Sequence, residues 1–198
     1  PGDSAKLAAE LAPRGIRFLD AAVSGTSVMA REKNLVVIAG GRAEDFQAAA
    51  PVLAGFSRAQ YYMGASGAGA MTKLIINAVL LGNMFALAEG MLLGMKAGVD
   101  SDRLLAVLKD GAAGSKAMDQ KGQMMVSGVY TPPHGAVSTS IKDAHLMLEQ
   151  SMALGAPLPL VSLTAEALRR AEERGWRDQD WACFLEALRE TAGLGARI

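Results

Sequence analysis

Residues 68–97 decide the fold, and they read AGAMTKLIINAVLLGNMFALAEGMLLGMKA. This run is apolar on nearly every face, and Gly98 follows it at a position where helices often end. We therefore predict one helix over 68–97, about 45 Å long at 1.5 Å per residue. Because its apolar surface extends almost all round, this helix must be covered by other helices or by a second subunit.

Downstream of residue 97 the sequence predicts only helices. Asp100 or Ser101 caps a helix that runs to about Lys109. Breaks that contain Gly or Pro separate the remaining helices, which are expected over residues 114–126, 139–154, 160–174 and 180–191. This part of the chain is therefore expected to be all-α.

Upstream of residue 68 the pattern is shorter and alternating. It predicts a helix over 3–12 capped by Asp3 or Ser4, strands over 16–19, 35–39 and 60–63, and a helix over about 43–53. Three short strands are too few for an independent sheet. We predict an α/β remnant over 1–65, with its missing strands upstream, and an all-helical part over 66–198.

Composition disfavours several classes of protein. Hydrophobic residues make up 51% of the chain and aromatic residues 5%, which suits packed helices better than aromatic-rich strands. Lys and Arg balance Asp and Glu at 20 each, which leaves no basic field for nucleic acid. The single cysteine, Cys183, forbids an internal disulfide and fits a reducing compartment. The chain opens Pro1-Gly2-Asp3 without a signal peptide, so we expect a truncated, cytoplasmic protein.

The uncharged run Leu74–Ala88 raises the question of a membrane span. It is shorter than the roughly 18 apolar residues that a spanning helix needs, and it contains Asn77, Gly82 and Asn83. We therefore expect no membrane association and interpret the run as a buried helix of a soluble protein.

Lys73 is the strongest candidate for chemistry. Lys73 and Asn77 are the polar members of a helix face that also carries Leu80, Met84 and Met91. Burial disfavours the charged form of a lysine, which makes a buried lysine a usable general acid or base near neutral pH. The alternative is a lysine that extends its ammonium group to solvent from the first turns of the helix.

Two glycine-containing turns are candidates for binding anions. Ser24-Gly25-Thr26 follows the strand that ends at Asp20, and its backbone N–H groups and hydroxyls suit a carboxylate, although such turns are usually structural. The glycines of residues 64–69 match no phosphate-binding pattern, because Thr72 stands where a third glycine would be. We expect these glycines to form a flexible interdomain connection.

The remaining polar candidates are weaker. Lys142-Asp143 opens the predicted helix 139–154, where Asp143 complements the helix dipole and Lys142 either meets an anion or is solvated. His134 and His145 lack a third ligand at metal-binding spacing, so no metal site is predicted. Cys183 is expected to be buried packing, and Asp180 to cap a helix beside aromatic residues.

Four stretches together resemble the β-hydroxyacid dehydrogenase family, which includes 3-hydroxyisobutyrate dehydrogenase and tartronate semialdehyde reductase. They are Asp20-Ala21-Ala22-Val23-Ser24-Gly25, the pattern Gly64-x-x-Gly67-x-Gly69-x-x-x-Lys73-x-x-x-Asn77, Ala88-Glu89-Gly90 and Lys142-Asp143. Their order and intervals fit the family over nearly the whole chain. The resemblance implies the end of a Rossmann-type sheet, joined by one long helix to a helical domain like that of 6-phosphogluconate dehydrogenase.

The resemblance also implies an NAD- or NADP-dependent oxidoreductase that interconverts a small 3-hydroxy acid and its semialdehyde or keto form. In that reading Lys73 moves the proton at the substrate oxygen and Asn77 orients the substrate. Ser24-Gly25-Thr26 holds the substrate carboxylate, and Lys142 contacts the cofactor. The dinucleotide-binding glycine loop would lie upstream, so the chain alone is expected to be inactive, and the helical part to form a homodimer or homotetramer.

Three departures from the family pattern predict an atypical substrate pocket. Thr26 replaces a glycine, Ile76 replaces the first Asn of a common pair, and residues 130–140 lack the usual phenylalanine-rich approach to the Lys-Asp pair. Two alternatives stand beside the dehydrogenase. One is an imine reductase, against which the retention of Lys73 argues. The other is a non-catalytic dimerisation module, which a solvent-directed Lys73 without a cleft beside it would favour.

Overall fold

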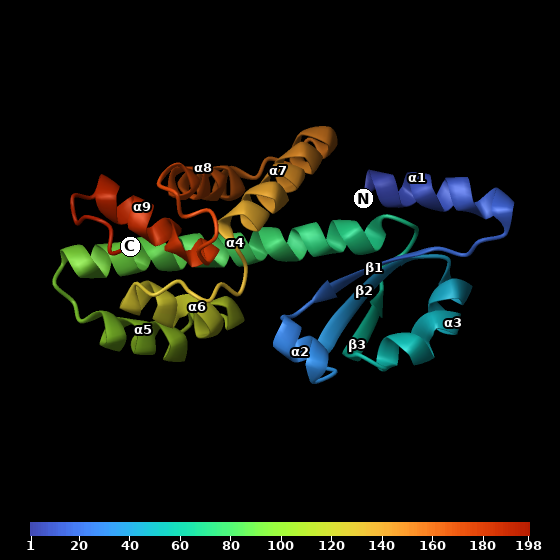
Figure 1. The fold of residues 1–198 in the computed structure, drawn as a ribbon, viewed down its shortest axis with the longest axis horizontal. Helices are drawn as coiled ribbons and strands as arrows, with labels where there is room; N and C mark the ends of the chain where they lie inside the picture. The colour runs from blue at the N-terminus through green and yellow to red at the C-terminus, as the bar shows by residue number, and fades with distance from the viewer. The chain divides into compact units, whose positions relative to one another are not determined.

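The chain consists of two compact units, Pro1–Ile76 and Asn77–Ile198. The computed structural model describes residues 1–198, except for the side chain of Ser27. The first unit contains a small sheet, and the second consists of helices. Helix α4 (Ala68–Lys96) begins in the first unit and continues into the second (Figure 1). The predicted fold class, an α/β remnant followed by an all-helical part, is confirmed.

The sheet of the first unit has three strands in the order β1-β2-β3. Strand β1 (Leu19–Ser24) runs antiparallel to β2 (Leu35–Gly41), and β2 runs parallel to β3 (Ser57–Tyr62). The parallel pair requires a crossover, which helix α3 (Ala43–Ala54) supplies. Val37, Ala39 and Leu53 are buried where α3 packs on β2, with Phe46, Ala49 and Phe56 against them.

The first strand lies later in the chain than the sequence predicts. The expected strand 16–19 and its end at Asp20 are wrong, because β1 begins at Leu19 and ends at Ser24. Asp20 is polar but only 8% exposed, and its Oδ2 accepts a hydrogen bond from the Ala70 N–H at 2.8 Å. A buried carboxylate inside a strand therefore resembles a strand end in the sequence, because its partner lies 50 residues away.

Two short helices also differ from expectation. Helix α1 (Gly2–Leu11) follows Pro1 with no side-chain cap, so Asp3 and Ser4 lie inside its first turn and are not caps. A 3₁₀ turn (Ala12–Arg14) extends it. Helix α2 (Ser27–Arg31) is absent from the prediction because it has only five residues.

Gly69, in the first turn of α4, is required by close packing, which corrects its interpretation as part of a flexible connection. A Cβ atom on Gly69 would collide with the Asp20 carbonyl oxygen and would lie 2.7 Å from that of Ile38. A Cβ on Gly40 of β2 would lie 2.8 Å from the Gly69 nitrogen. The first turn of α4 thus contacts the backbones of β1 and β2 directly, at a distance that only glycine permits.

The second unit consists of α4 from Asn77 onward and the helices that follow it. These are α5 (Ser101–Asp110), α6 (Lys116–Ser127), α7 (Val137–Leu154), α8 (Pro159–Glu173) and α9 (Phe184–Thr191), with a 3₁₀ turn η2 (Trp181–Cys183) before α9. Asp100 and Ser115 cap α5 and α6 by accepting hydrogen bonds from the Arg103 and Met118 N–H groups. The predicted cap at Asp100 is therefore confirmed.

Helix α4 forms the centre of the second unit. Figure 1 shows α5 and α6 on one side of α4, and α7, α8 and α9 on the other. Met84, Ala88 and Met91 are fully buried along α4. Phe85 stacks on Phe184 of α9 with the ring centroids 5.9 Å apart.

Part of α4 nevertheless remains uncovered. Val79 is 59% exposed and Leu93 is 73% exposed. By length and hydropathy alone α4 could also cross a membrane, and core helices of soluble proteins satisfy the same two criteria. The buried stripe of methionine and alanine belongs to a packed helix, whereas Val79 and Leu93 form an exposed apolar stripe.

Candidate functional site

Asn77, Asp143 and Lys142 form a polar cluster in the second unit. The Asn77 side-chain amide (Nδ2) on α4 donates a hydrogen bond to Oδ2 of Asp143 on α7 at 3.1 Å. The other carboxylate oxygen, Oδ1, lies 3.0 Å from the Lys142 ammonium group. The Asp143 carboxylate is held between an amide and an ammonium group, which fixes the orientation of the amide. The sequence pattern assigns Asp143 only to the helix dipole and does not reveal this bond.

The start of α7 corrects that assignment. The helix begins at Val137 and not at residue 139, so Lys142 and Asp143 lie in its second turn and not in its first. The dipole effect falls off within the first turn, so it explains neither residue. The bond to Asn77 accounts for Asp143, and the side chain of Lys142 is 66% exposed.

A cavity of about 140 Å³ lies beside this cluster. Its polar lining comes from Asn77, Asp143, Thr139 and Ser140, and its apolar lining from Leu80, Leu81, Gly135, Met147 and Trp181. Ligand pockets for drug-sized molecules occupy roughly 300–1,000 Å³. A cavity of this size and mixed character suits a molecule with few heavy atoms.

Lys73 lies on α4 one helical turn before Asn77, and its side chain is half-buried. Residues four apart on a helix share a face. Lys73 and Asn77 therefore lie on one face of α4, as the sequence predicts, and Met84 and Met91 are buried further along that face. Lys73 belongs to the first compact unit and Asn77 to the second.

The turn Ser24-Gly25-Thr26 connects the end of β1 to the start of α2. Gly25 has φ = 142°, and a Cβ there would lie 2.6 Å from a methyl group of Leu35, so the position requires glycine. Thr26 is the N-cap of α2, and its Oγ1 accepts a hydrogen bond from the Met29 N–H at 3.4 Å. Thr26 thus has a structural use that the family's glycine would lack.

The sequence prediction missed the burial and the ion pairs of two carboxylates in the second unit, Asp180 and Glu186. Asp180 caps η2, as expected, by accepting from the Ala182 N–H at 3.0 Å. It is also fully buried and pairs with the equally buried Lys121, 59 residues away, at 2.7 Å from Oδ1 and 2.5 Å from Oδ2. Charge spacing along one helix could not reveal a pair that joins distant elements.

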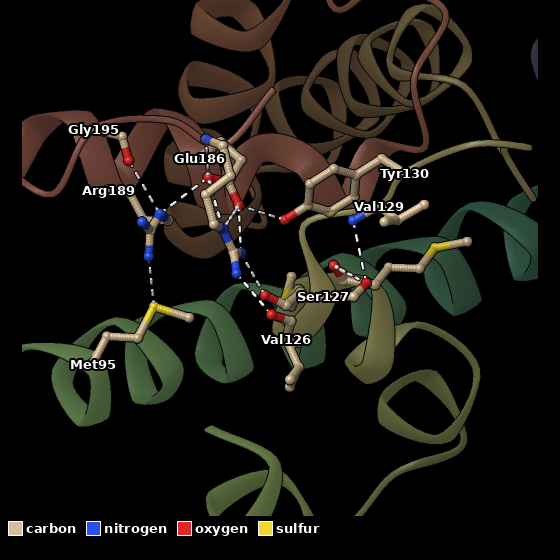
Figure 2. Close-up of polar contacts among 11 residues, drawn as sticks. Met95, Val126, Ser127, Val129, Tyr130, Glu186, Arg189 and Gly195 are labelled. Carbon is tan, nitrogen blue, oxygen red and sulfur yellow. Dashed lines mark hydrogen bonds and ion pairs between the residues drawn. The ribbon is translucent and has the colours of Figure 1, made fainter. Parts of the chain in front are cut away.

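Glu186 is the second buried carboxylate (Figure 2). It accepts a hydrogen bond from the Tyr130 hydroxyl at 2.7 Å, and it pairs with Arg189 and Arg197. The Arg197 guanidinium also donates to the carbonyls of Met125 and Val126 at the end of α6. Burial raises the pKa of Tyr130 well above its ordinary value, and the charge of Glu186 adds to this effect.

Cys183 and His134 are not among the residues that line the cavity. Cys183 is fully buried, as predicted, and burial raises its pKa to about 12. His134 is exposed, and its backbone N–H donates to Asp180. Among the side chains that the structure describes, no group of three or more His, Cys, Asp and Glu residues could hold a metal ion.

Two family models together cover nearly the whole chain. The model described as NAD-binding of NADP-dependent 3-hydroxyisobutyrate dehydrogenase matches residues 67–188. The model described as the NAD binding domain of 6-phosphogluconate dehydrogenase matches residues 1–64. The chain belongs to the β-hydroxyacid dehydrogenase family. The resemblance predicted from the four sequence stretches is thereby confirmed.

Relatives of this chain include a reductase and a dehydrogenase. It is 31% identical over 175 residues to the chloroplastic glyoxylate/succinic semialdehyde reductase 2 of Arabidopsis thaliana, covering 88% of this chain and 49% of that protein. It is 34% identical over 179 residues to L-threonate dehydrogenase of Escherichia coli O6:H1, covering 90% of this chain and 59% of that protein. The chain therefore spans only about half to three-fifths of these relatives' length.

A solved structure supports the same family. The crystal structure of 3-hydroxyisobutyrate dehydrogenase from Salmonella typhimurium superimposes with a TM-score of 0.86 at 30% identity. The match covers 94% of this chain and 65% of that one. Both units of this chain therefore have a counterpart in one related enzyme.

Proposed function

We propose that this chain supplies the proton-transfer and substrate-binding residues of an NAD(P)-dependent dehydrogenase or reductase. Its substrate would be a small 3-hydroxy acid, interconverted with its semialdehyde or keto form. Family membership supports the reaction class, and the reductase and dehydrogenase relatives support a small carboxylate-bearing substrate. The whole protein would carry the activity, and we expect residues 1–198 alone to be inactive.

The Asn77–Asp143 hydrogen bond is the observation that carries this proposal. It joins the second and fourth of the family-like stretches, which lie 66 residues apart, at the edge of one small cavity. An amide fixed by a carboxylate has its second N–H and its oxygen in a defined direction. Asn77 can therefore orient a small polar substrate at low entropic cost, because its own rotamer is already set.

Lys73 would move the proton. In the oxidative direction a neutral Lys73 amine accepts the proton of the substrate hydroxyl as the C–H bond breaks. In the reductive direction the Lys73 ammonium returns that proton to the carbonyl oxygen. A positioned acid or base of this kind typically contributes about 10²–10⁴-fold to the rate. The half-buried position of Lys73 on α4 supports the role.

Ser24, Gly25 and Thr26 would hold the substrate carboxylate. The positive φ of Gly25 turns the chain sharply after β1, and the turn leads directly into Thr26, the N-cap of α2. N–H groups at such a turn favour an anion. Because Thr26 already caps α2, we propose that it contributes its backbone more than its hydroxyl.

Lys142 would contact the cofactor. The exposed ammonium of Lys142 is held by Asp143, and an exposed cation fits the anionic groups of a dinucleotide. When bound, the nicotinamide would supply the hydride acceptor or donor for the substrate carbon. The described residues offer no glycine-rich dinucleotide loop, so the main cofactor contacts would come from a part of the whole protein outside residues 1–198.

The helical part would associate as a homodimer or homotetramer. A groove lies between α4 and the start of α8, lined by Val79, Gly82 and Ala86 on one side and by Pro157, Leu158 and Leu160 on the other. Its lining is mostly apolar, and Val79 and Leu160 are 59% and 41% exposed. A second copy of the chain is the partner that a family of homo-oligomers would place there.

The proposed function also implies a domain organisation and a cellular location for the protein. We propose that residues 1–65 are the end of the dinucleotide-binding domain, and that residues 66–198 form the interdomain helix and the substrate and dimerisation domain. We also propose that the protein acts in the cytoplasm, without nucleic-acid or membrane partners. Fractionation of cells that express the whole protein tests the location.

Steady-state assays of the full-length protein test the proposed function. Glyoxylate and succinic semialdehyde would be offered with NADH or NADPH, and L-threonate and 3-hydroxyisobutyrate with the oxidised cofactors. We expect saturable turnover of at least one compound with one cofactor. No turnover with any pair, by a folded full-length protein, would exclude this substrate class.

A further inference from the structure

The buried pair Lys121–Asp180 adjoins Trp181, a residue that lines the cavity. Asp180 is fully buried and accepts hydrogen bonds from Lys121, from the Ala182 N–H at 3.0 Å and from the His134 N–H at 2.8 Å. Lys121 on α6 has only 6% of its side chain exposed. Both oxygens of one carboxylate thus bind donors from three separate segments of the chain.

Stability alone is a poor explanation for this pair. Removing two opposite charges from water costs free energy that their attraction only partly returns, so well-packed apolar residues often serve equally well. Burial lowers the pKa of Lys121, and Asp180 opposes that effect, as expected for a desolvated ammonium that keeps one partner. A charged pair in this place therefore requires a reason beyond stability.

The pair fixes two chain segments against each other. Backbone hydrogen bonds join residues 130–138 to residues 177–181, among them Asp180 N–H to the Tyr130 carbonyl at 2.9 Å and Trp181 N–H to the Gly135 carbonyl at 3.0 Å. A bridge between Ala136 and Asp180 continues the pairing. Asp180 lies at the centre of this pairing and Lys121 ties it to α6.

These segments supply one wall of the cavity. Trp181 and Gly135 both line it, together with Asn77 and Asp143. A Cβ on Gly135 would lie 3.3 Å from Trp181 Cδ1, so glycine lets the indole lie directly against the backbone. The Lys121 ammonium lies 5.0 Å from the centre of the Trp181 ring, within cation–π range. Lys121 therefore contacts both Asp180 and the wall residue that follows it.

We propose that Lys121 and Asp180 are positioning residues that hold Trp181, and that Trp181 limits the chain length of the substrate. This inference rests on the proposed function, because it assigns the cavity to the substrate. The indole is a rigid, bulky part of the cavity lining, which also includes the polar groups of Asn77 and Asp143. A substrate carbon chain that extends beyond the reacting carbon would meet it.

Substitutions at the pair test the positioning. Asp180→Asn leaves Lys121 without a charged partner, and that variant can fail to fold. The double variant Lys121→Met with Asp180→Asn removes both charges and avoids a lone buried ion. Glu186→Gln is the matched control, because Glu186 is equally buried, while the described lining of the cavity includes neither Glu186 nor its partners Tyr130 and Arg197.

Fluorescence reports the position of Trp181 without any enzyme assay. In a Trp176→Phe background Trp181 is the single tryptophan of these 198 residues. We expect acrylamide to quench Trp181 weakly in this background and in the Glu186→Gln variant, and several-fold more strongly in the double variant. Equal quenching in the double variant and in Glu186→Gln would overturn the positioning role.

Kinetics of the full-length protein test the consequence for substrates. Glyoxylate and succinic semialdehyde differ in chain length, and we expect Trp181→Leu to raise the ratio of kcat/KM for the longer over the shorter aldehyde by about tenfold or more. The double variant should raise KM by about tenfold with kcat changed much less, as for a loss of binding that is uniform through the reaction. A fall in melting temperature with unchanged KM and unchanged ratio would contradict the proposal.

The two proposals fail in distinguishable ways. If the wild-type full-length protein turns over none of the four compounds, the proposed substrate class is wrong, and the quenching comparison still decides whether Lys121 and Asp180 hold Trp181. If turnover is present and Trp181→Leu leaves the ratio unchanged, the substrate class stands and the limiting role of Trp181 is wrong.

Discussion

The side chains of Asn77 and Asp143 are joined by a 3.1 Å hydrogen bond between residues 66 positions apart in the chain. The bond connects the central helix α4 to α7, and Asp143 in turn pairs with Lys142. One carboxylate thereby links the residue proposed to orient the substrate to the residue proposed to contact the cofactor. A substitution of Asn77 or of Lys142 should therefore alter both the substrate-orienting residue and the cofactor-contacting residue.

Asn77→Ala should lower kcat/KM of the full-length enzyme by about tenfold or more, because a fixed donor that orients the substrate is lost. Asp143 also loses one of its partners. Asn83→Ala is the matched control, since Asn83 lies on α4 but is exposed. Steady-state kinetics of both variants measure the difference. Equal values for Asn77→Ala and Asn83→Ala would remove Asn77 from the site.

Lys73→Ala should lower kcat of the full-length enzyme by about 10²-fold or more, the usual scale for a positioned acid or base. Lys6→Ala should have no effect, because Lys6 lies on α1 with most of its side chain exposed. Circular dichroism checks that the variants keep their helices. Near wild-type turnover by folded Lys73→Ala would show that another group moves the proton.

Two glycines of α4 should respond oppositely to alanine. Gly69→Ala places a Cβ 2.7 Å from the Ile38 carbonyl oxygen, and we expect a loss of about 1–3 kcal/mol in the free energy of unfolding. A Cβ on Gly90 meets no described heavy atom within 4 Å, so Gly90→Ala should gain up to about 1 kcal/mol from helix propensity. Urea denaturation measures both. A stable Gly69→Ala variant would show that the contact between α4 and the strands can relax.

Local patterns predict the helices well because their causes are local. The long apolar run predicts α4 to within one residue at its end, and Asp100 and Gly98 mark the turn after it through capping preferences that act over a few residues. The family-like stretches likewise single out Asn77 and Lys142, because each stretch is contiguous in the chain. Both kinds of signal lie within one segment of sequence.

The sequence does not predict hydrogen bonds and ion pairs between residues far apart in the chain. Asp20 resembles a strand end, and Asp180 resembles a simple cap, because an isolated acidic residue is normally solvated. Their partners, the Ala70 N–H and Lys121, lie 50 and 59 residues away. An acidic side chain can be buried only where the fold brings a donor or a cation against it. The spacing of residues along the chain does not predict such a distant partner.

Cys183 should make the protein sensitive to alkaline pH. Burial, aided by the charge of Asp180, raises the pKa of the folded thiol from 9.0 to about 12. The unfolded chain therefore loses this proton first, so the stabilising contribution is full below about pH 9 and is lost as the pH rises towards 12. Urea denaturation across this range should show a steeper fall for wild type than for Cys183→Ala.

The same burial should protect the thiol chemically. Iodoacetamide should modify Cys183 far more slowly in the native chain than in the unfolded chain, since the thiolate is the reactive form. Parallel slopes in the urea experiment, or rapid alkylation of the native protein, would mean that the helix around Cys183 opens readily.

Light scattering tests association through the helical part. We expect the 198-residue chain to give at least twice its 20.6 kDa monomer mass. Val79→Asp together with Leu160→Asp should yield monomers, because both side chains line the apolar groove. Val52→Asp on α3 is the control, since Val52 is 72% exposed and lies in the first unit. A clean monomer for the wild-type chain would leave the exposed stripe of α4 without a partner copy.

The bond between Asn77 and Asp143 also restricts how this chain can evolve. Met84 and Met91 are fully buried and anchor the rotation of α4 within the second unit. One inserted residue between Asn77 and Met84 would turn Asn77 by about 100° around the helix axis, and the amide would point away from α7. Substitutions can accumulate along this stretch, but insertions and deletions cannot without loss of the bond. Descendants that keep the bond should therefore align over residues 77–84 without a single gap.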